Sequence, residues 1–159
     1  MTALIRKRAG SGAGLAIVLG GLIAGVVDIT VADVMSVMNG GSPLRMLQGI
    51  ATGLLGMASF RGGLATAALG LACHFSITLG AAAAYYAVSR WLRVMVREPV
   101  VCGLLYGVPI YLIVNFVIVP LSRIGRVLPG SPGQVMFGVV VLMVGVGLPI
   151  GLMTRRFAG

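Results

Sequence analysis

Apolar residues in this chain follow one another in four long runs, rather than in the spaced stripe of a water-soluble helix. The runs cover about residues 14–34, 64–92, 100–121 and 134–154. Each is long enough to cross a hydrocarbon core of roughly 30 Å, because an α-helix rises about 1.5 Å per residue. The pattern therefore predicts an all-α membrane protein, a bundle of four transmembrane helices in a single transmembrane domain over residues 1–159.

A shorter helix is predicted after the first span. Residues 39–41 (Asn-Gly-Gly) favour a turn, and Ser42-Pro43 is typical of an N-cap followed by proline at the first helical position. The helix that follows, over about residues 43–57, is glycine-rich and too short to span the bilayer comfortably. We predict an interfacial or partly re-entrant helix, and a true extra span is the alternative.

The second span is expected to continue as helix toward residue 97. Glu98-Pro99 should end it, because proline cannot continue the hydrogen-bonded ladder and restricts the residue before it. Near this end, Tyr85, Tyr86 and Trp91 are typical of the aromatic belt that a helix places at the lipid headgroups.

The composition supports a membrane protein. The 159 residues are 58% hydrophobic and 9% charged, against roughly 25% charged in a soluble domain, which excludes a water-soluble globule. The net charge is +9, but the basic residues lie in small groups at the ends of the apolar runs, where they anchor helices at phospholipid headgroups. Membrane lipids are therefore the expected partner, and nucleic acid is not.

The basic residues also predict the orientation. With four spans, both termini lie on one side, and that side carries eight Lys and Arg against four on the other. Positive charge favours the cytoplasm, so we predict a multi-pass protein with cytoplasmic N- and C-termini. A cleavable signal peptide ending near Ala32 is the alternative for the first run, but Asp28 and the length of the run argue against it. The four residues on the opposite side are Arg45, Arg61, Arg123 and Arg126.

Glycines recur at the four-residue spacing that lets helix backbones approach closely. They favour a tight bundle and leave open a homo-oligomer joined through the same faces. Pro109 and Pro149, each within a Gly-x-Pro-Ile segment, are expected to kink the third and fourth spans. The glycine pairs are Gly21 with Gly25, Gly103 with Gly107, and Gly147 with Gly151.

Polar side chains inside the spans need an explanation, because an ionisable group at the bilayer centre costs about 2.5 to 3.5 kcal/mol on insertion scales. Asp28, His74 and Asn115 all fall in the half of the membrane away from the termini; Thr78 lies one turn after His74, and Tyr111 one turn before Asn115. One hypothesis is that Asp28, His74, Asn115 and Tyr111 line a polar cavity in which Asp28 and His74 exchange protons near neutral pH. The alternatives are that these residues only fix the bundle, or that Asp28 lies near enough to the outer interface to be hydrated.

No motif for catalysis or cofactor binding occurs in the sequence: there is no nucleophile elbow, phosphate loop, H-E-x-x-H or pair of catalytic carboxylates. Cys73 and Cys102 are expected to be buried small apolar residues, and His74 has no second histidine to complete a metal site. We therefore predict no enzymatic activity, no cofactor and no metal.

Several short segments can be compared with a known family. They are residues 21–27 (Gly-Leu-Ile-Ala-Gly-Val-Val), the Ser42-Pro43 pair, residues 74–77 (His-Phe-Ser-Ile) before a Tyr-rich helix end, and residues 103–105 (Gly-Leu-Leu) with Pro120. In this order they resemble the YagU-like family of small bacterial inner-membrane proteins, whose molecular function is largely unknown. The resemblance implies a four-span architecture and a bacterial inner (plasma) membrane.

The sequence thus predicts an integral inner-membrane protein of unknown molecular function, structural or accessory in role. The alternative is a small transporter or proton-conducting channel that uses Asp28 and His74. A third hypothesis is a lipid-interacting protein in which the short helix around Arg45 senses headgroups.

Overall fold

The computed structural model describes residues 2–125 and 130–157. This part of the chain is helical throughout, apart from short connections, and contains no strand. Arg126, one of the four basic residues counted on the side away from the termini, lies outside the described residues. The elements are α1 (Thr2–Met38), α2 (Pro43–Leu55), η1 (Gly56–Arg61), α3 (Gly63–Ser89), α4 (Val94–Arg97), α5 (Pro99–Ile113), η2 (Val114–Ile118), α6 (Val119–Leu121), α7 (Pro132–Val141), η3 (Leu142–Gly147) and α8 (Leu148–Phe157).

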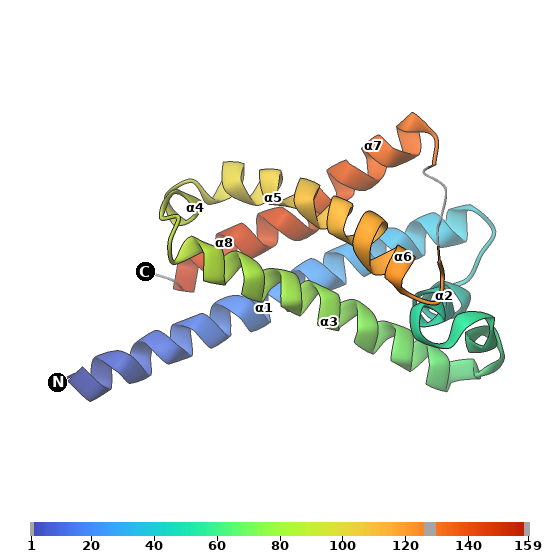
Figure 1. Cartoon of the computed structure of the whole chain (residues 1–159), viewed down its shortest axis with the longest axis horizontal. Helices are drawn as coiled ribbons and strands as arrows, with labels where there is room; N and C mark the ends of the chain where they lie inside the picture. Colours follow the sequence, from blue (N-terminus) through green and yellow to red (C-terminus); the bar gives the residue numbers. More distant parts are fainter. Residues whose placement is uncertain (1, 126–129, 158–159) are drawn as a thin grey trace.

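Four helical stretches are long and apolar enough to cross a membrane, as the sequence predicts: Gly12–Met38, Gly63–Ser89, Pro99–Leu121 and Pro132–Phe157. They run alternately in opposite directions, so both ends of the chain lie at the same end of the bundle (Figure 1). The prediction of an all-α bundle of four transmembrane helices is confirmed, and the protein is a multi-pass membrane protein by the length and apolar character of these helices.

α2 is the predicted short helix, and it begins where the sequence places it. The Ser42 hydroxyl accepts a hydrogen bond from the Arg45 N–H, and Pro43 occupies the first turn. At 13 residues, α2 rises about 20 Å, too little for a span. It lies against α3 at the end of the bundle opposite the termini (Figure 1).

α2 is held on α3 by a close backbone contact and a polar contact. A methyl group on Gly70 would overlap the carbonyl group of Leu47, so only glycine allows this approach. The Gln48 side chain, almost fully buried, donates from Nε2 to the Gly63 carbonyl oxygen at 3.0 Å. α2 is therefore a fixed part of the bundle, and its buried amide is satisfied.

The second span ends earlier than the sequence predicts. α3 ends at Ser89, the chain turns, and the one-turn helix α4 precedes Pro99, which begins α5 instead of ending α3. The physical reason lies at Tyr85, which is fully buried and donates its hydroxyl to the Met95 carbonyl oxygen at 3.1 Å, tying the returning chain to α3. Tyr85 thus belongs to the core and not to an aromatic belt, whereas Trp91 is 85% exposed.

The third and fourth spans each contain a π-helical segment that periodicity did not predict. η2 ends two residues before Pro120, and η3 ends two residues before Pro149. A proline has no N–H for the carbonyl four residues earlier and its ring crowds that turn, so a wider turn before it relieves the clash. Pro109, by contrast, lies inside the regular helix α5.

The core lies in one half of the bundle. Its buried side chains come from all four spans: Ala24, Ala82, Tyr85, Ile110, Val146 and Ile150. We call the part of the bundle around this cluster the closed half. The other half, toward α2, is the open half. The cavity described below occupies the open half and borders the core cluster.

Candidate functional site

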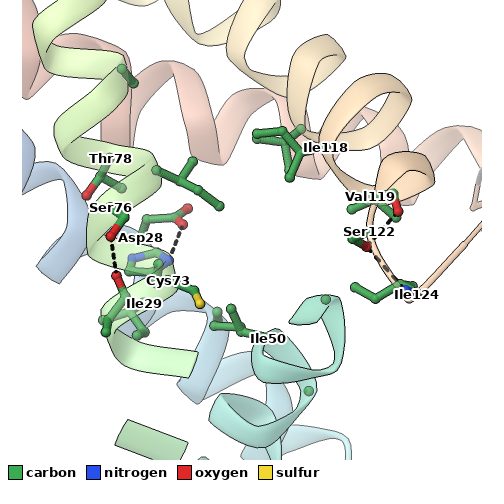
Figure 2. Close-up of a pocket in the computed structure, with 18 of the residues that line it drawn as sticks. Asp28, Ile29, Ile50, Cys73, Ser76, Thr78, Ile118, Val119, Ser122 and Ile124 are labelled. Carbon is green, nitrogen blue, oxygen red and sulfur yellow. Dashed lines mark hydrogen bonds and ion pairs between the residues drawn. The ribbon is translucent and has the colours of Figure 1, made fainter. Parts of the chain in front are cut away.

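A cavity of about 830 Å³ occupies the open half. Its walls come from α1, α2, α3, the region from α5 to the turn after α6, and η3. Figure 2 shows Asp28, Ile29 and Cys73 on one side of it, and Ile118, Val119 and Ser122 on the other. Its floor includes Ile110 and Val146 of the core cluster, so the cavity rests directly on the closed half. The cavity is partly open to the outside of the bundle.

The rim of the cavity is closed on one side by a backbone contact between α2 and the turn after α6. The Arg123 N–H donates to the Gly53 carbonyl oxygen at 2.9 Å. Ser122 stabilises the same turn, because its hydroxyl donates to the Val119 carbonyl oxygen and accepts from the Ile124 N–H. The wall formed by the third span is therefore joined to the wall formed by α2.

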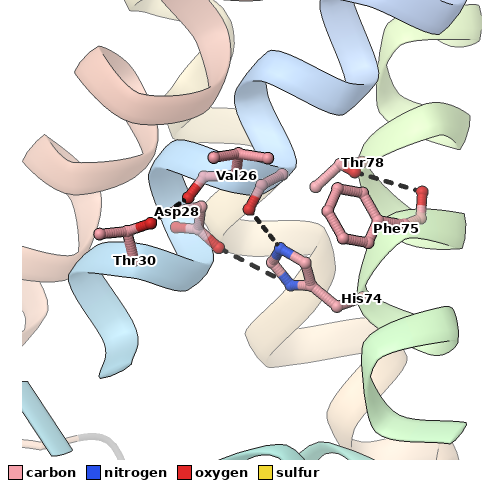
Figure 3. Close-up of polar contacts among 7 residues, drawn as sticks. Val26, Asp28, Thr30, His74, Phe75 and Thr78 are labelled. Atoms are coloured by element: carbon pink, nitrogen blue, oxygen red, sulfur yellow. Dashed lines mark hydrogen bonds and ion pairs between the residues drawn. The ribbon is translucent and has the colours of Figure 1, made fainter. Parts of the chain in front are cut away.

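Asp28 and His74 meet in the wall of this cavity (Figure 3). His74 Nδ1 lies 4.0 Å from Asp28 Oδ2, and the two side chains are 11% and 22% exposed. His74 Nε2 lies 2.9 Å from the carbonyl oxygen of Gly25. Asp28 is ten residues before the end of α1, and His74 eleven after the start of α3, so both lie about 15 Å from the α2 end of their spans.

Gly25 makes this meeting possible. A methyl group there would lie 2.6 Å from Cε1 of Phe75 and 2.9 Å from Oγ1 of Thr78. Because Gly25 has no side chain, α1 can approach α3 until the His74 ring reaches the Gly25 carbonyl group. Gly21 has the same effect one turn away, where an added methyl would lie 2.8 Å from Cα of Leu79.

The contact with Gly25 identifies which ring nitrogen of His74 donates. A carbonyl oxygen can only accept, so Nε2 carries hydrogen and donates to Gly25. Nδ1 then faces the Asp28 carboxyl group. If Nδ1 and the carboxylate both lacked a proton, two electron-rich atoms would face each other in apolar surroundings. The arrangement is therefore favourable when the pair holds one further proton between these two groups, which makes the pair neutral overall.

The structure does not bring all the predicted polar residues into the cavity. Thr78 lines it, but its hydroxyl donates to the Phe75 carbonyl oxygen on its own helix at 3.2 Å. Tyr111 and Asn115 are not among the lining residues, and the Asn115 amide donates to the Tyr111 carbonyl oxygen at 2.9 Å. The side-chain amide of Asn115 is therefore hydrogen-bonded within its own helix. The lining of the cavity is mainly apolar, and not polar as the hypothesis required.

The six glycines singled out in the sequence lie at close contacts between helices of this same chain. A methyl on Gly103 would lie 2.7 Å from the Gly147 carbonyl oxygen, and one on Gly151 would lie 2.5 Å from the Pro99 carbonyl oxygen. Methyl groups on Gly107 and Gly147 would overlap backbone atoms of the opposite span. These glycines hold the third span against the fourth, while Gly21 and Gly25 hold the first against the second.

Sequence reasoning missed the apolar walls of the cavity. Gly49 and Gly53 line it from α2, one turn apart, and an added methyl on Gly49 would meet nothing within 4 Å. The signal was present in the sequence, because these glycines place a smooth face on a helix too short to span. The short helix was predicted, but which surface it presents to the bundle was not.

Cys73 lines the cavity beside His74, and Cys102 lies elsewhere, with its Sγ 3.7 Å from the Val94 carbonyl oxygen. Both thiols are free. Within the described residues no group of three or more His, Cys, Asp or Glu side chains could hold a metal ion.

Comparison of the chain with protein-family models, with curated proteins and with solved structures finds no match.

Proposed function

We propose that this protein is a non-enzymatic membrane protein that binds one apolar or amphiphilic molecule in the cavity of its open half. The observation that carries the proposal is the cavity itself, about 830 Å³ of space between the spans, walled mainly by aliphatic side chains. Ligand sites in proteins are typically roughly 300–1,000 Å³, mostly apolar, with a few polar groups that orient the ligand. The role fits an accessory protein that senses, stores or presents a hydrophobic molecule.

Membrane lipids are the expected surroundings of this site. The helices that line it are apolar on their outer surfaces, so lipids are the molecules that surround the site in a bilayer. An apolar chain gains contact with the aliphatic walls, while its polar end finds the Asp28–His74 pair.

Filling the cavity tests this proposal. Gly49→Phe places a ring where an added carbon meets no neighbour, so it should occupy the cavity without straining the bundle. We expect native mass spectrometry of wild-type protein with 1-decanol to show one bound decanol, and Gly49→Phe to show none.

Gly80→Phe is the matched control. Gly80 is exposed on α3, outside the lining, and also has open space around an added carbon. It should bind decanol as wild type does. Equal binding by wild type and Gly49→Phe would show that decanol binds elsewhere, and the proposal would then be wrong.

A second candidate, proton-linked transport, is favoured by the presence of Asp28 and His74 in the cavity wall. Transport would require the closed half to open, because Tyr85, Val146 and Ile150 fill it in the conformation described here. Proton flux into liposomes under a pH gradient tests this function. Flux that Asp28→Asn abolishes would establish transport, and a rate equal to that of empty liposomes would leave binding alone.

We propose the location and orientation together. The excess of basic residues at the end of the bundle that carries both termini supports cytoplasmic termini, and the likeness to the YagU-like family supports the bacterial inner membrane. Reporter fusions after residue 159 test the orientation: a cytoplasm-only reporter should be active and a periplasm-only reporter inactive.

A further inference from the structure

We infer that the ligand of the cavity is a hydrophobic monocation with an N–H group, such as a protonated long-chain amine, and that its binding releases the proton held by the Asp28–His74 pair. This inference deepens the proposed function and rests on it, because it names the chemical class of the molecule that the cavity takes.

Charge complementarity selects a cation. Among the described lining residues Asp28 is the one acid, and no Lys or Arg is present. The titratable groups that face the cavity are Asp28 from α1, and His74 and Cys73 from α3; α2, η3 and the region from α5 to α6 contribute none. An anionic headgroup would meet the Asp28 carboxylate with no cation of the lining to oppose it other than His74. A cationic headgroup would meet its only anion.

Geometry leaves the carboxylate free to take a second partner. The distance from His74 Nδ1 to Asp28 Oδ2 is 4.0 Å, longer than a hydrogen bond, while His74 Nε2 is already held at 2.9 Å by Gly25. No hydrogen bond from another described side chain reaches the Asp28 carboxyl group. An ammonium group entering the cavity can therefore donate directly to the carboxylate, whereas the histidine ring cannot move closer without losing its bond to Gly25.

Proton release follows from the charge count. In the inferred unliganded state, the pair holds one proton between Nδ1 and the carboxyl group and is neutral overall. An ammonium ion on the carboxylate would leave two positive charges and one negative charge in mainly apolar surroundings, which is costly. Loss of the Nδ1 proton from His74 restores neutrality. The ammonium keeps its protons, Asp28 stays ionised, His74 becomes neutral while Nε2 still donates to Gly25, and the released proton is taken up by a base of the aqueous buffer.

Three probes with the same alkyl chain test this inference: decylamine, 1-decanol and decanoate. Isothermal titration calorimetry on the full-length protein in dodecyl maltoside at pH 7, in two buffers of different ionisation enthalpy, gives both the affinity and the number of protons released. We expect decylamine to bind about tenfold more tightly than decanol and to release about one proton, and decanoate to bind most weakly.

Asp28→Asn should reduce decylamine to the affinity of decanol and abolish proton release, while decanol binding stays unchanged and reports that the variant is folded. Asp33→Asn is the matched control, because Asp33 lies on the same helix and outside the lining. It should behave as wild type.

The failures are distinguishable. Equal affinities for decylamine and decanol without proton release, or tightest binding of decanoate, would overturn the inference and leave the proposed function intact. Loss of decanol binding in Asp28→Asn would make Asp28 a structural residue and would overturn it as well. Absence of binding for all three probes to wild type would remove the proposed function together with the inference.

Discussion

The two halves of the bundle use the same residue types for opposite purposes. In the closed half, glycines bring backbones together until no space is left, as where Gly103 and Gly147 face each other. In the open half, Gly49 leaves space, because a methyl group there would meet nothing within 4 Å, and one on Gly53 would only reach ordinary contact with Ser122, at 3.6 Å from its Cβ. The comparison teaches that glycine in a membrane helix has no fixed meaning. Its effect depends on whether the opposite helix brings its backbone into contact with the glycine or leaves a cavity there.

The polar groups differ in the same way. In the closed half, Tyr85 donates to Met95 and Tyr106 donates to the Ala81 carbonyl oxygen at 3.0 Å, so each hydroxyl has one fixed partner. In the open half, Asp28 and His74 form a loose pair at the edge of a cavity. The first arrangement stabilises the fold, and the second leaves a charge available to a ligand.

The largest effect is expected where the closed half has no space. Gly147→Ala places a methyl group on the backbone of the third span, so we expect it to lower the free energy of unfolding by about 3 kcal/mol, the upper end for overpacking. Gly80→Ala, at an exposed helical position with open space, should instead be neutral or stabilising by up to about 1 kcal/mol. Unfolding in mixed micelles with SDS measures both. Equal effects on the free energy of unfolding would show that the third and fourth spans move apart at little cost.

The next largest loss of stability is expected from replacing an isoleucine of the closed half by alanine, and the same replacement in the open half serves as the comparison. Ile150→Ala empties a fully buried position and should cost about 2 kcal/mol, the lower end for such a change, because lipid removes most of the transfer contribution. Ile77→Ala only enlarges an existing cavity and should cost less than about 1 kcal/mol. The same SDS titration compares them. A larger loss at Ile77 would mean that the cavity is filled in the folded protein.

The sequence predicts the local features of this fold but not how the spans are rotated about their axes. The four spans and the start of α2 could be predicted, because length, apolar character and the Ser-Pro signal are local properties. The rotation of each span could not, since a uniformly apolar helix shows no periodicity to mark its inner face. Asn115 therefore looked like a partner of Asp28, although it bonds to its own helix.

Asp28 and His74 could be proposed as partners from the sequence because they are the ionisable groups at similar depth in neighbouring spans. The role of Gly70 could not, because it has no glycine four residues away and so shows no packing motif. The π-helical segments were also hidden, since a proline predicts a local disturbance but not its form.

A smaller effect is expected from Tyr85→Phe. The variant keeps the buried ring and leaves the Met95 carbonyl oxygen without its donor, so we expect a loss of about 1 kcal/mol. Tyr86→Phe, on the next residue, should change the stability little, because no hydrogen bond from its hydroxyl occurs in the described part of the chain. Both variants should release a proton on binding decylamine as wild type does. Loss of release in Tyr85→Phe would show that the two halves are coupled.

The smallest change in stability is expected for Asp28→Asn. Removing the carboxylate does not strand a buried charge, because His74 can lose its Nδ1 proton and then accept a hydrogen bond while Nε2 still donates to Gly25. The free energy of unfolding at pH 7 should therefore change by less than that of Tyr85→Phe, whereas proton release on decylamine binding should disappear. SDS titration and calorimetry on the two variants form a crossed comparison, with Tyr85→Phe losing stability alone and Asp28→Asn losing release alone. If Asp28→Asn were the more destabilising, the Asp28–His74 pair would belong to the architecture of the bundle, and the open half would differ from the closed half only in how much space it encloses.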